Sequence, residues 1–363
     1  MQNKKKNNQK AIRYIDLFCG IGGFRIAAEQ IALELGIPIK CFFSSDIDEE
    51  CQKAYEENFG EKPAGNITTV KAEDVPNHDV LFAGFPCQPF SIIGHRRGLE
   101  DTRGTLFFEI ARILEAKKPS AFLLENVKLL AGHNNGKTLK RIMLVLKDLG
   151  YHADYRVLNA LDFGLPQKRE RIFIVGFKKP CSFDWPKGDI SMTPLKAILE
   201  DNVPDQYYAS EYIRINRLKK HKPTDEPTIW HENKAGHISA YPYSCALRAG
   251  ASYNYLLVNG ERRLTPREML RLQGFPDSFK DVCNYSQTRK QAGNSLPVPV
   301  AKAVLKNLFI SQGWHNGYIK YDYNNLQHQI IDGQVTIFEE RSKYGRGAKI
   351  KNSRKIQAAL SAK

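Results

Sequence analysis

A strand, a glycine-rich turn, a helix and a second strand follow one another near the start of the chain, and this succession limits the possible folds most. Residues 14–18 (YIDLF) predict a strand and residues 19–23 (CGIGG) predict a tight turn. Apolar residues then recur at helical spacing up to Gly36, a residue typical of helix C-termini. Residues 41–45 predict the second strand. A parallel βαβ unit satisfies this order and places the turn at the carboxyl edge of a sheet.

The same alternation of strand and helix continues as far as residue 178. Strands are predicted at residues 80–84, 121–124, 155–158 and 172–177, and helices at 105–116 and 137–149. Strands that alternate with helices are typical of a parallel sheet covered on both faces. We therefore predict an α/β fold with a doubly wound, mostly parallel Rossmann-like sheet.

The pattern changes after residue 178, and this change predicts a second, smaller and irregular domain. Proline, tyrosine, histidine and asparagine are frequent up to residue 260, with little sustained periodicity. Regularity returns at Thr265 and Pro266, which suit the N-cap and first turn of a helix. The expected division is residues 1–184 and 286–330 for the first domain, 185–285 for the second domain with a hinge, and 331–363 for a basic tail.

The charge of the chain predicts a polyanionic partner. There are 54 Lys and Arg against 39 Asp and Glu, which gives a formal net charge of +15. No apolar run is long enough for a membrane span, and the basic start lacks the apolar stretch of a signal peptide, so we expect a cytoplasmic protein. The seven cysteines are scattered without metal-ligand spacing, so we expect reduced thiols and neither a disulfide framework nor a metal site.

Cys87 is the candidate nucleophile. It lies in the tetrapeptide FPCQ, directly after the apolar strand predicted at residues 80–84, and strand ends in an open α/β sheet form the ligand crevice. A lone cysteine is most often an inert core residue, but here Pro86 stiffens its approach and the basic segment 91–98 resembles a lid. Glu125 ends a neighbouring strand and is expected at the same edge.

The glycine turn and Asp46 predict a binding site for an adenosine-containing ligand. Glycines let the backbone approach a ligand closely, and an acidic residue at the end of the second strand commonly binds ribose hydroxyls. The six-residue glycine fingerprint of dinucleotide-binding proteins is absent from residues 19–23, which disfavours a nicotinamide cofactor.

Taken in order, these motifs resemble those of DNA cytosine-5 methyltransferases of the bacterial type II restriction-modification type. The matching blocks are residues 16–24 (DLFCGIGGF), 84–91 (GFPCQPFS), 125–127 (ENV), 167–171 (QKRER), 263–268 with 273–276 (RLTPRE and QGFP), and 293–295 (GNS). The resemblance extends over residues 13–305. It implies a catalytic and cofactor-binding first domain, and it implies that the variable second domain recognises the DNA target.

The resemblance also implies a covalent mechanism with S-adenosyl-L-methionine as methyl donor. Cys87 as thiolate adds to C6 of cytosine, C5 then takes the methyl group, and loss of the C5 proton releases the enzyme. Glu125 holds the base by its N3 and N4 edge. Arg171 contacts the O2 side, with Arg169 nearby. The base must leave the duplex for this chemistry, so base flipping is expected.

For the cofactor, the resemblance implies contacts from both ends of the first domain. The expected binding residues are Phe18, Gly20, Gly22, Gly23, Asp46, Ile47, Asn66, Ile67, Leu106, Asn294 and Ser295. One position departs from the family pattern, which often has an acidic residue where this chain has Asn66. The amide oxygen can still accept a hydrogen bond from the adenine amino group, but without a charge.

DNA contacts are expected from the lid and from the second domain. The candidate residues are Ser91, Ile93, His95, Arg96, Arg97, Tyr243 and Arg248. Ile93 could enter the space left by the flipped base or could pack against the protein. We therefore expect an enzyme that methylates C5 of cytosine in a short double-stranded DNA sequence, protects that DNA from a companion restriction endonuclease, and can act as a monomer.

Two alternative functions stay open at this point. One is an RNA cytosine-5 methyltransferase of the same fold that acts on transfer RNA, although the long variable stretch favours a DNA sequence reader. The other is a catalytically inactive DNA-binding regulator, although Cys87, Glu125 and Arg171 are all present. Methylation assays on plasmid DNA and on transfer RNA distinguish the three. No rule converts the variable residues into a recognised sequence.

Overall fold

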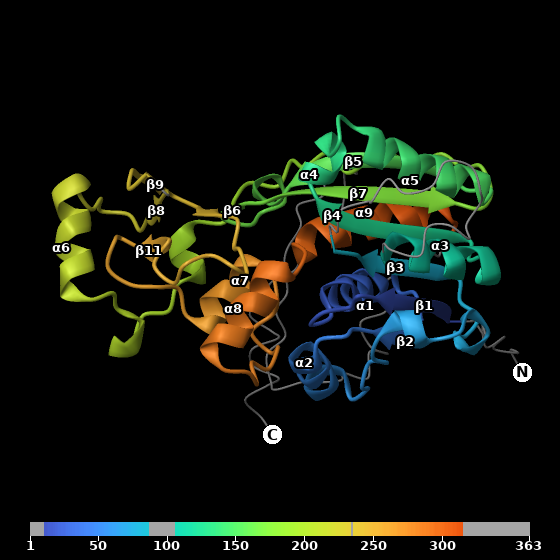
Figure 1. Cartoon of the computed structure of the whole chain (residues 1–363), viewed down its shortest axis with the longest axis horizontal. Helices are drawn as coiled ribbons and strands as arrows, with labels where there is room; N and C mark the ends of the chain where they lie inside the picture. The colour runs from blue at the N-terminus through green and yellow to red at the C-terminus, as the bar shows by residue number, and fades with distance from the viewer. Residues whose placement is uncertain (1–10, 87–105, 234, 315–363) are drawn as a thin grey trace, which may run out of the picture. The chain divides into compact units, whose positions relative to one another are not determined.

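A six-stranded sheet, covered by helices, forms one half of the computed structural model, which describes residues 11–86, 106–233 and 235–314 (Figure 1). The strand order is β2-β1-β3-β4-β7-β5. The strands are β1 (Ile12–Leu17), β2 (Ile39–Ser45), β3 (Val80–Gly84), β4 (Ala121–Val127), β5 (His152–Asn159) and β7 (Glu170–Phe177). Neighbours from β2 to β4 are parallel, and β7 runs antiparallel to both β4 and β5. The predicted doubly wound, mostly parallel α/β sheet is confirmed.

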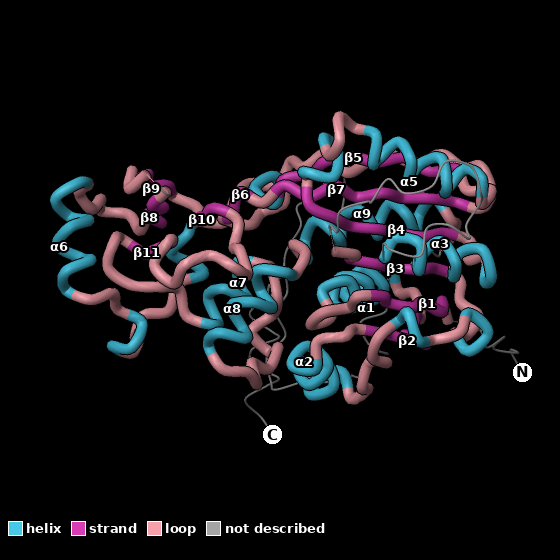
Figure 2. Tube along the Cα trace, in the orientation of Figure 1, coloured by secondary structure: helices cyan, strands magenta, loops and turns pink. Residues whose placement is uncertain are grey.

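Helices cover both faces of this sheet, as Figure 2 shows. One face carries α1 (Gly23–Leu35) and α9 (Val298–Ser311), and the other carries α3 (Leu106–Lys117) and α5 (Lys137–Asp148). Two further helices are α2 (Glu49–Phe59), which begins four residues after β2, and α4 (Leu129–Gly132), which follows β4. The predicted helices near 105–116 and 137–149 correspond to α3 and α5.

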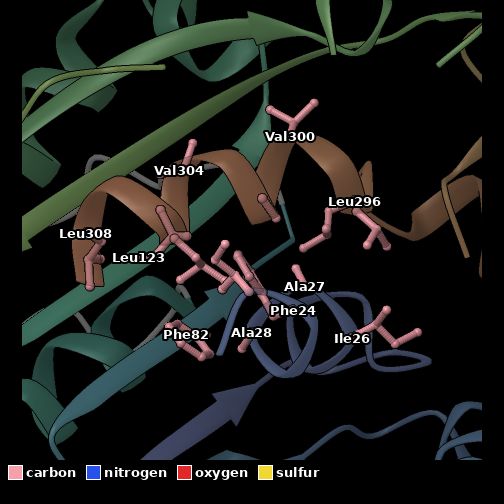
Figure 3. Packing of buried hydrophobic residues seen from close by; sticks show 14 of the residues in the cluster. Phe24, Ile26, Ala27, Ala28, Phe82, Leu123, Leu296, Val300, Val304 and Leu308 are labelled. Carbon is pink, nitrogen blue, oxygen red and sulfur yellow. The ribbon is translucent and has the colours of Figure 1, made fainter. Parts of the chain in front are cut away.

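The strand residues alternate between the two faces, and this alternation builds two separate cores. Phe82 and Leu123 pack with α1 and α9, whereas Leu81 and Phe122 pack with α3 and α5. Figure 3 shows the first core, where Val304 of α9 lies over the sheet beside the side chains of α1. α9 lies far from α1 in sequence, so the C-terminal part of the described chain returns to pack on the sheet beside the N-terminal helix.

The stretch predicted to be irregular contains a small antiparallel sheet of order β11-β8-β9. Its elements are α6 (Glu211–Lys220), β8 (Ile229–Glu232), β9 (Ile238–Tyr241), β10 (Ser244–Cys245) and β11 (Leu256–Val258), and β10 pairs with β6 (Gln167–Lys168). Strands of two to four residues are too short to show a period in sequence, which explains why the pattern did not predict them. A third hydrophobic cluster around Ile229 and Leu256 supports this part of the chain.

Two helices connect this region back to the first domain. They are α7 (Pro266–Leu272) and α8 (Tyr285–Asn294). The predicted cap of α7 is confirmed, since the Thr265 side chain accepts from the backbone of Glu268 while the Glu268 carboxylate accepts from the backbone of Thr265. Trp185, placed by the sequence at the start of the second domain, packs in the first core and donates to Asp154 at 2.7 Å. The domain division itself stays a proposal.

No helix within the described ranges is long and apolar enough to cross a membrane. The same part of the chain contains no group of histidine, cysteine, aspartate and glutamate side chains that could hold a metal ion.

Candidate active site

A cavity of about 640 Å³ opens at the carboxyl ends of β1 to β4. The turn after β1 and residues 291 and 293–296 are among the segments that line it. Ten of the eleven predicted cofactor residues line it: Phe18, Gly20, Gly23, Asp46, Ile47, Asn66, Ile67, Leu106, Asn294 and Ser295. Its volume lies within the range of small-molecule sites.

Gly22 is the predicted cofactor residue that does not line the cavity. It precedes α1 with a φ of 86°, and a Cβ atom there would lie 2.3 Å from the ring of Phe59. Packing against α2 therefore requires this glycine. Gly20 also has a positive φ, of 53°, but a Cβ atom there would meet nothing within 4 Å. Of these two glycines, Gly20 leaves open space beside the cavity.

Asp46 lines the cavity and also fixes the glycine turn. One carboxylate oxygen accepts from the backbone of Gly20 at 2.8 Å, and the other accepts from the backbone of Asp48 at 2.9 Å. Burial raises the pKa of Asp46, and these two hydrogen bonds oppose the rise. Each oxygen keeps a second lone pair, so the carboxylate can hold the turn and accept a ligand hydroxyl at once.

Asn66 lines the cavity as a cap of a short 3₁₀ turn. Its amide oxygen accepts from the backbone of Thr68 at 3.0 Å. This contact gives the asparagine a local role that the sequence comparison with the family pattern did not reveal. Aspartate satisfies the same cap, which explains how either residue suits this position.

Glu125 and Arg171 form a buried ion pair beside the same cavity. The register of β4 and β7 places Val127 opposite Arg171, so Glu125 and Arg171 are diagonal neighbours on one face. The Arg171 Nε atom lies 3.0 Å from Glu125 Oε1, and the two side chains are 13% and 9% exposed. Burial raises the pKa of the Glu125 carboxyl, and the Arg171 charge opposes part of that rise.

This pair keeps atoms available for a ligand. Glu125 Oε2 and Arg171 Nη2 make no hydrogen bond to another residue in the described part of the chain, and both side chains line the cavity. One site thus presents a carboxyl group with a raised pKa and a cationic donor. A planar heterocycle with both ring nitrogen and carbonyl oxygen matches that arrangement.

Arg169 does not belong to this pair, which corrects its predicted catalytic role. Its side chain is fully buried and does not line the cavity. The guanidinium donates to the backbone carbonyls of Leu247 at 3.0 Å, of Gly293 at 2.9 Å and of Ser295. Arg169 is the single residue between β6 and β7, outside the β7 register that holds Arg171 beside Glu125. Arg169 therefore joins three distant segments.

Cys87 lies outside the described residues, as do the predicted DNA contacts Ser91, Ile93, His95, Arg96 and Arg97. Phe85 and Pro86, which directly precede Cys87, line the cavity.

Asn126 is a site residue that the sequence did not single out. Its side-chain amide donates to the carbonyl of Phe85 at 2.8 Å, two residues before Cys87. The sequence feature that could have indicated a role for Asn126 at the site is its position next to Glu125 in the ENV block.

The two cysteines seen at the cavity lack the low thiol pKa of an activated nucleophile. Cys19 and Cys51 line the cavity, and burial raises the pKa of both thiols. A raised pKa keeps them protonated at neutral pH and poorly nucleophilic. All six cysteines within the described ranges are free. The thiols already seen at the site are therefore unsuited to the chemistry assigned to Cys87.

The predicted DNA contacts of the second domain lie away from the cavity. Tyr243 stacks on Tyr241 with ring centroids 5.1 Å apart. Arg248 is exposed and lies over the ring of Tyr255 at 4.9 Å. Both side chains are thus supported by an aromatic neighbour.

Comparisons with known proteins agree with the motifs. The family model of C-5 cytosine-specific DNA methylases matches residues 12–310. Type II methyltransferase M.NgoBI of Neisseria gonorrhoeae is 55% identical over 297 residues, which cover 80% of this chain and 91% of that protein. Type II methyltransferase M.HaeII of Haemophilus aegyptius is 54% identical over 326 residues, which cover 89% of this chain and 100% of that protein.

A solved structure supports the fold alone. The methyltransferase EhMeth of Entamoeba histolytica superimposes with a TM-score of 0.63 at 20% identity, covering 84% of this chain and 99% of that one. The predicted family is confirmed by the sequence relatives: the chain belongs to the C-5 cytosine-specific DNA methylases and is a DNA cytosine-5 methyltransferase of the bacterial type II class.

Proposed function

We propose that this enzyme transfers a methyl group from S-adenosyl-L-methionine to C5 of a cytosine within one short double-stranded DNA sequence. The observation that carries this proposal is the shared cavity. It is lined by the glycine turn, Asp46, Glu125 and Arg171, and also by Phe85 and Pro86, which directly precede Cys87. A methyl donor and a base held there would lie in one space.

The residues of the cavity suit an adenosine-containing methyl donor. Gly20 leaves open space for a ligand, and Asp46 keeps lone pairs for ribose hydroxyls. Phe18, Ile47 and Leu106 supply apolar surface on which an adenine ring can lie. When bound, S-adenosyl-L-methionine supplies an electrophilic methyl group.

Cys87 starts the reaction on the base. Its thiolate adds to C6 of cytosine, and the electron pair of the C5–C6 double bond makes C5 nucleophilic. C5 would then form the new bond to the methyl carbon while the bond between that carbon and the sulfur of the donor breaks, and the donor would leave as a neutral thioether. A base removes the proton from C5, the C6–sulfur bond breaks, and the thiolate leaves as the double bond returns.

Glu125 and Arg171 stabilise the charge that develops on the ring. Glu125 can share a proton with N3 as electron density moves toward that atom, and burial, which raises the pKa of the carboxyl, makes this exchange easier. Arg171 holds Glu125 in place through Nε and offers Nη2 to the O2 atom of the base. Asn126 fixes the carbonyl of Phe85, which lies two residues before Cys87 in the chain.

The DNA duplex must release its target base for this chemistry, because C5 and C6 are stacked inside B-form DNA. We propose that residues 91–97 contact the opened duplex and that the second domain reads the sequence. Protection of DNA from a companion restriction endonuclease then follows in the cytoplasm, with a monomer as the acting species.

DNA containing 5-fluorocytosine tests this mechanism. Fluorine cannot leave C5 as a proton does, so the wild-type enzyme should remain covalently attached to the DNA through Cys87. Cys87→Ala should form no adduct and transfer no methyl group, while its DNA affinity stays within about threefold because few phosphate contacts are lost. Transfer RNA and plasmid DNA serve as parallel substrates. An adduct on another cysteine, or methylation of transfer RNA alone, would contradict the proposal.

A further inference from the structure

We propose that Arg289 of α8 is a positioning residue for DNA sequence selectivity. It presets the backbone of the 246–255 loop, the segment between β10 and β11 that carries Arg248, before DNA binds. This inference rests on the proposed function, since it assigns a role within sequence recognition by the same enzyme.

Arg289 contacts three consecutive residues of the loop. Its guanidinium donates to the backbone carbonyls of Ala251 and Ser252, the latter at 3.2 Å, and lies 4.7 Å from the ring centroid of Tyr253. Arg289 itself is only 9% exposed. Hydrogen bonds from a buried charged donor are stronger than neutral ones, so these contacts restrain the loop backbone whatever its side chains do.

Two other buried arginines hold the same loop at its two ends. Arg169 donates to the carbonyl of Leu247 near the start, and Arg217 donates to the carbonyl of Asn254 near the end. Arg169 is 0% exposed and Arg217 is 3% exposed. Arg289 supplies the middle contact, so three guanidinium groups donate to backbone carbonyls near the start, in the middle and near the end of the loop.

The restrained loop still exposes the groups that can read a base. Arg248 is exposed, with its guanidinium over the ring of Tyr255 at 4.9 Å, and its backbone N–H donates to the Tyr255 hydroxyl at 3.0 Å. An arginine that reads guanine must present two donors in one plane. A loop whose shape is already set loses less conformational entropy when it does so.

Helix α8 provides a rigid support for Arg289. The next residue, Lys290, pairs with Asp48 at 2.6 Å, and Gln291 donates to the carbonyl of Glu50 at 3.0 Å. Both contacts attach α8 to the N-terminal end of α2, beside the cofactor cavity. Through α8, the 246–255 loop is therefore held in a fixed position relative to the cavity that the flipped base must enter. A positioning residue requires such a rigid support.

Selectivity measurements on full-length variants test this role. Sequencing of DNA methylated by the wild type first identifies the target site. The ratio of kcat/KM on a duplex with that site to kcat/KM on each singly substituted duplex is then measured for wild type, Arg289→Gln, Arg289→Lys and Arg271→Gln. Arg271 is the matched control, because its guanidinium contacts Asp277 and Ile198 on the α7 side.

Arg289→Gln should lower the selectivity ratio about tenfold, the size expected when a charge-assisted hydrogen bond is lost. The affinity for S-adenosyl-L-methionine should stay within about twofold, as measured by calorimetry, because Arg289 does not line the cavity. Arg289→Lys, which keeps the charge but not the fork of donors, should lie between wild type and Arg289→Gln. Arg271→Gln should match the wild type.

An unchanged ratio in Arg289→Gln would overturn the role of Arg289 while leaving the proposed function intact. A uniform loss on all sequences, with a weaker salt dependence, would identify a phosphate contact and overturn it as well. If Arg289→Gln does not fold, the selectivity ratio of Arg289→Lys replaces it: a lowered ratio supports the role of Arg289, and an unchanged ratio overturns it. A wild type that methylates no DNA site would instead reject the proposed function, and this inference with it.

Discussion

At the scale of single residues, the proposed chemistry depends on a buried carboxyl group held beside a buried guanidinium. Glu125→Gln keeps the volume of the side chain but removes its ability to exchange a proton with the base. We expect kcat to fall by about 10²- to 10⁴-fold, the usual contribution of a positioned acid or base. Single-turnover methyl transfer measures this effect. A fall smaller than about tenfold would show that Glu125 only binds the base.

The affinity of Glu125→Gln for S-adenosyl-L-methionine is the matched control. Glu125 and Arg171 lie on β4 and β7, whereas Asp46 follows β2 at the edge of the sheet, so the cofactor affinity should change by less than about threefold. A large loss of cofactor affinity would mean that the ion pair shapes the whole cavity.

Asp16 is a second residue whose environment predicts a measurable effect. Its carboxyl is fully buried, and neither oxygen has a hydrogen-bond partner within the described ranges. Burial raises the pKa of Asp16 well above its usual range, although the charge of Arg25 opposes the rise. The folded state therefore holds a proton that the unfolded state loses above about pH 4.

Asp16→Asn tests in which direction the raised pKa of Asp16 makes the stability of the fold change with pH. Below about pH 4 the carboxyl is protonated in both states, so pH changes nothing there. Above that pH the unfolded wild type ionises first, and its stability should fall relative to Asp16→Asn by up to about 1.4 kcal/mol per pH unit until the folded-state pKa is reached. Urea unfolding at several pH values measures the difference. A constant difference would contradict a raised pKa.

At the scale of elements, the antiparallel pairing of β4 and β7 holds Glu125 and Arg171 in register. Gly176 of β7 lies opposite Phe122 of β4, and a Cβ atom at Gly176 would lie 2.1 Å from the Phe122 ring. Gly176→Ala should destabilise the protein by about 1–3 kcal/mol through overpacking. Chemical unfolding measures this cost.

Gly132→Ala is the matched control for that prediction. A Cβ atom at Gly132, in α4, would meet nothing within 4 Å, so the substitution should be neutral or slightly stabilising. Equal effects of the two substitutions would show that the ring of Phe122 moves aside without cost.

At the scale of the whole molecule, sequence recognition should move with the second domain. Trp185 belongs to the first core, and Arg262 forms a buried ion pair with Glu268 of α7, so an exchange of residues 186–261 leaves both anchors in place. A chimera with the corresponding segment of a relative should methylate the donor's target sequence, with Cys87 still the nucleophile. Sequencing of methylated DNA identifies the site. Methylation of the original site would place recognition elsewhere, first of all in residues 91–98.

The net charge of +15 belongs to this scale too. It indicates a polyanionic partner but does not say which residues touch it, because charge acts over a distance and without direction. The buried arginines make this clear. Arg169, Arg217 and Arg289 all contribute to the net charge, yet each donates to backbone carbonyls inside the protein.

The sequence by itself determined the α/β class and the order of the motifs, and through the family resemblance it named most of the predicted cofactor residues that line the cavity. The α/β class follows from local patterns, since strand runs, the glycine turn and the Thr265 cap depend on neighbours in the chain. Gly20 and Asp46 could be predicted because they follow β1 and β2 and so lie at the carboxyl edge of the sheet, whereas Asn294, at the end of α8, was predicted from the family resemblance.

Only the tertiary structure decided which chemically similar residues do different work. Arg169 and Arg171 are two residues apart, yet one joins Leu247 to Gly293 and the other pairs with Glu125. The same holds for Asn126, whose partner Phe85 lies 41 residues earlier. Hydrogen-bond partners far apart in sequence are chosen by packing, and packing depends on the whole chain, so no local pattern carries that information.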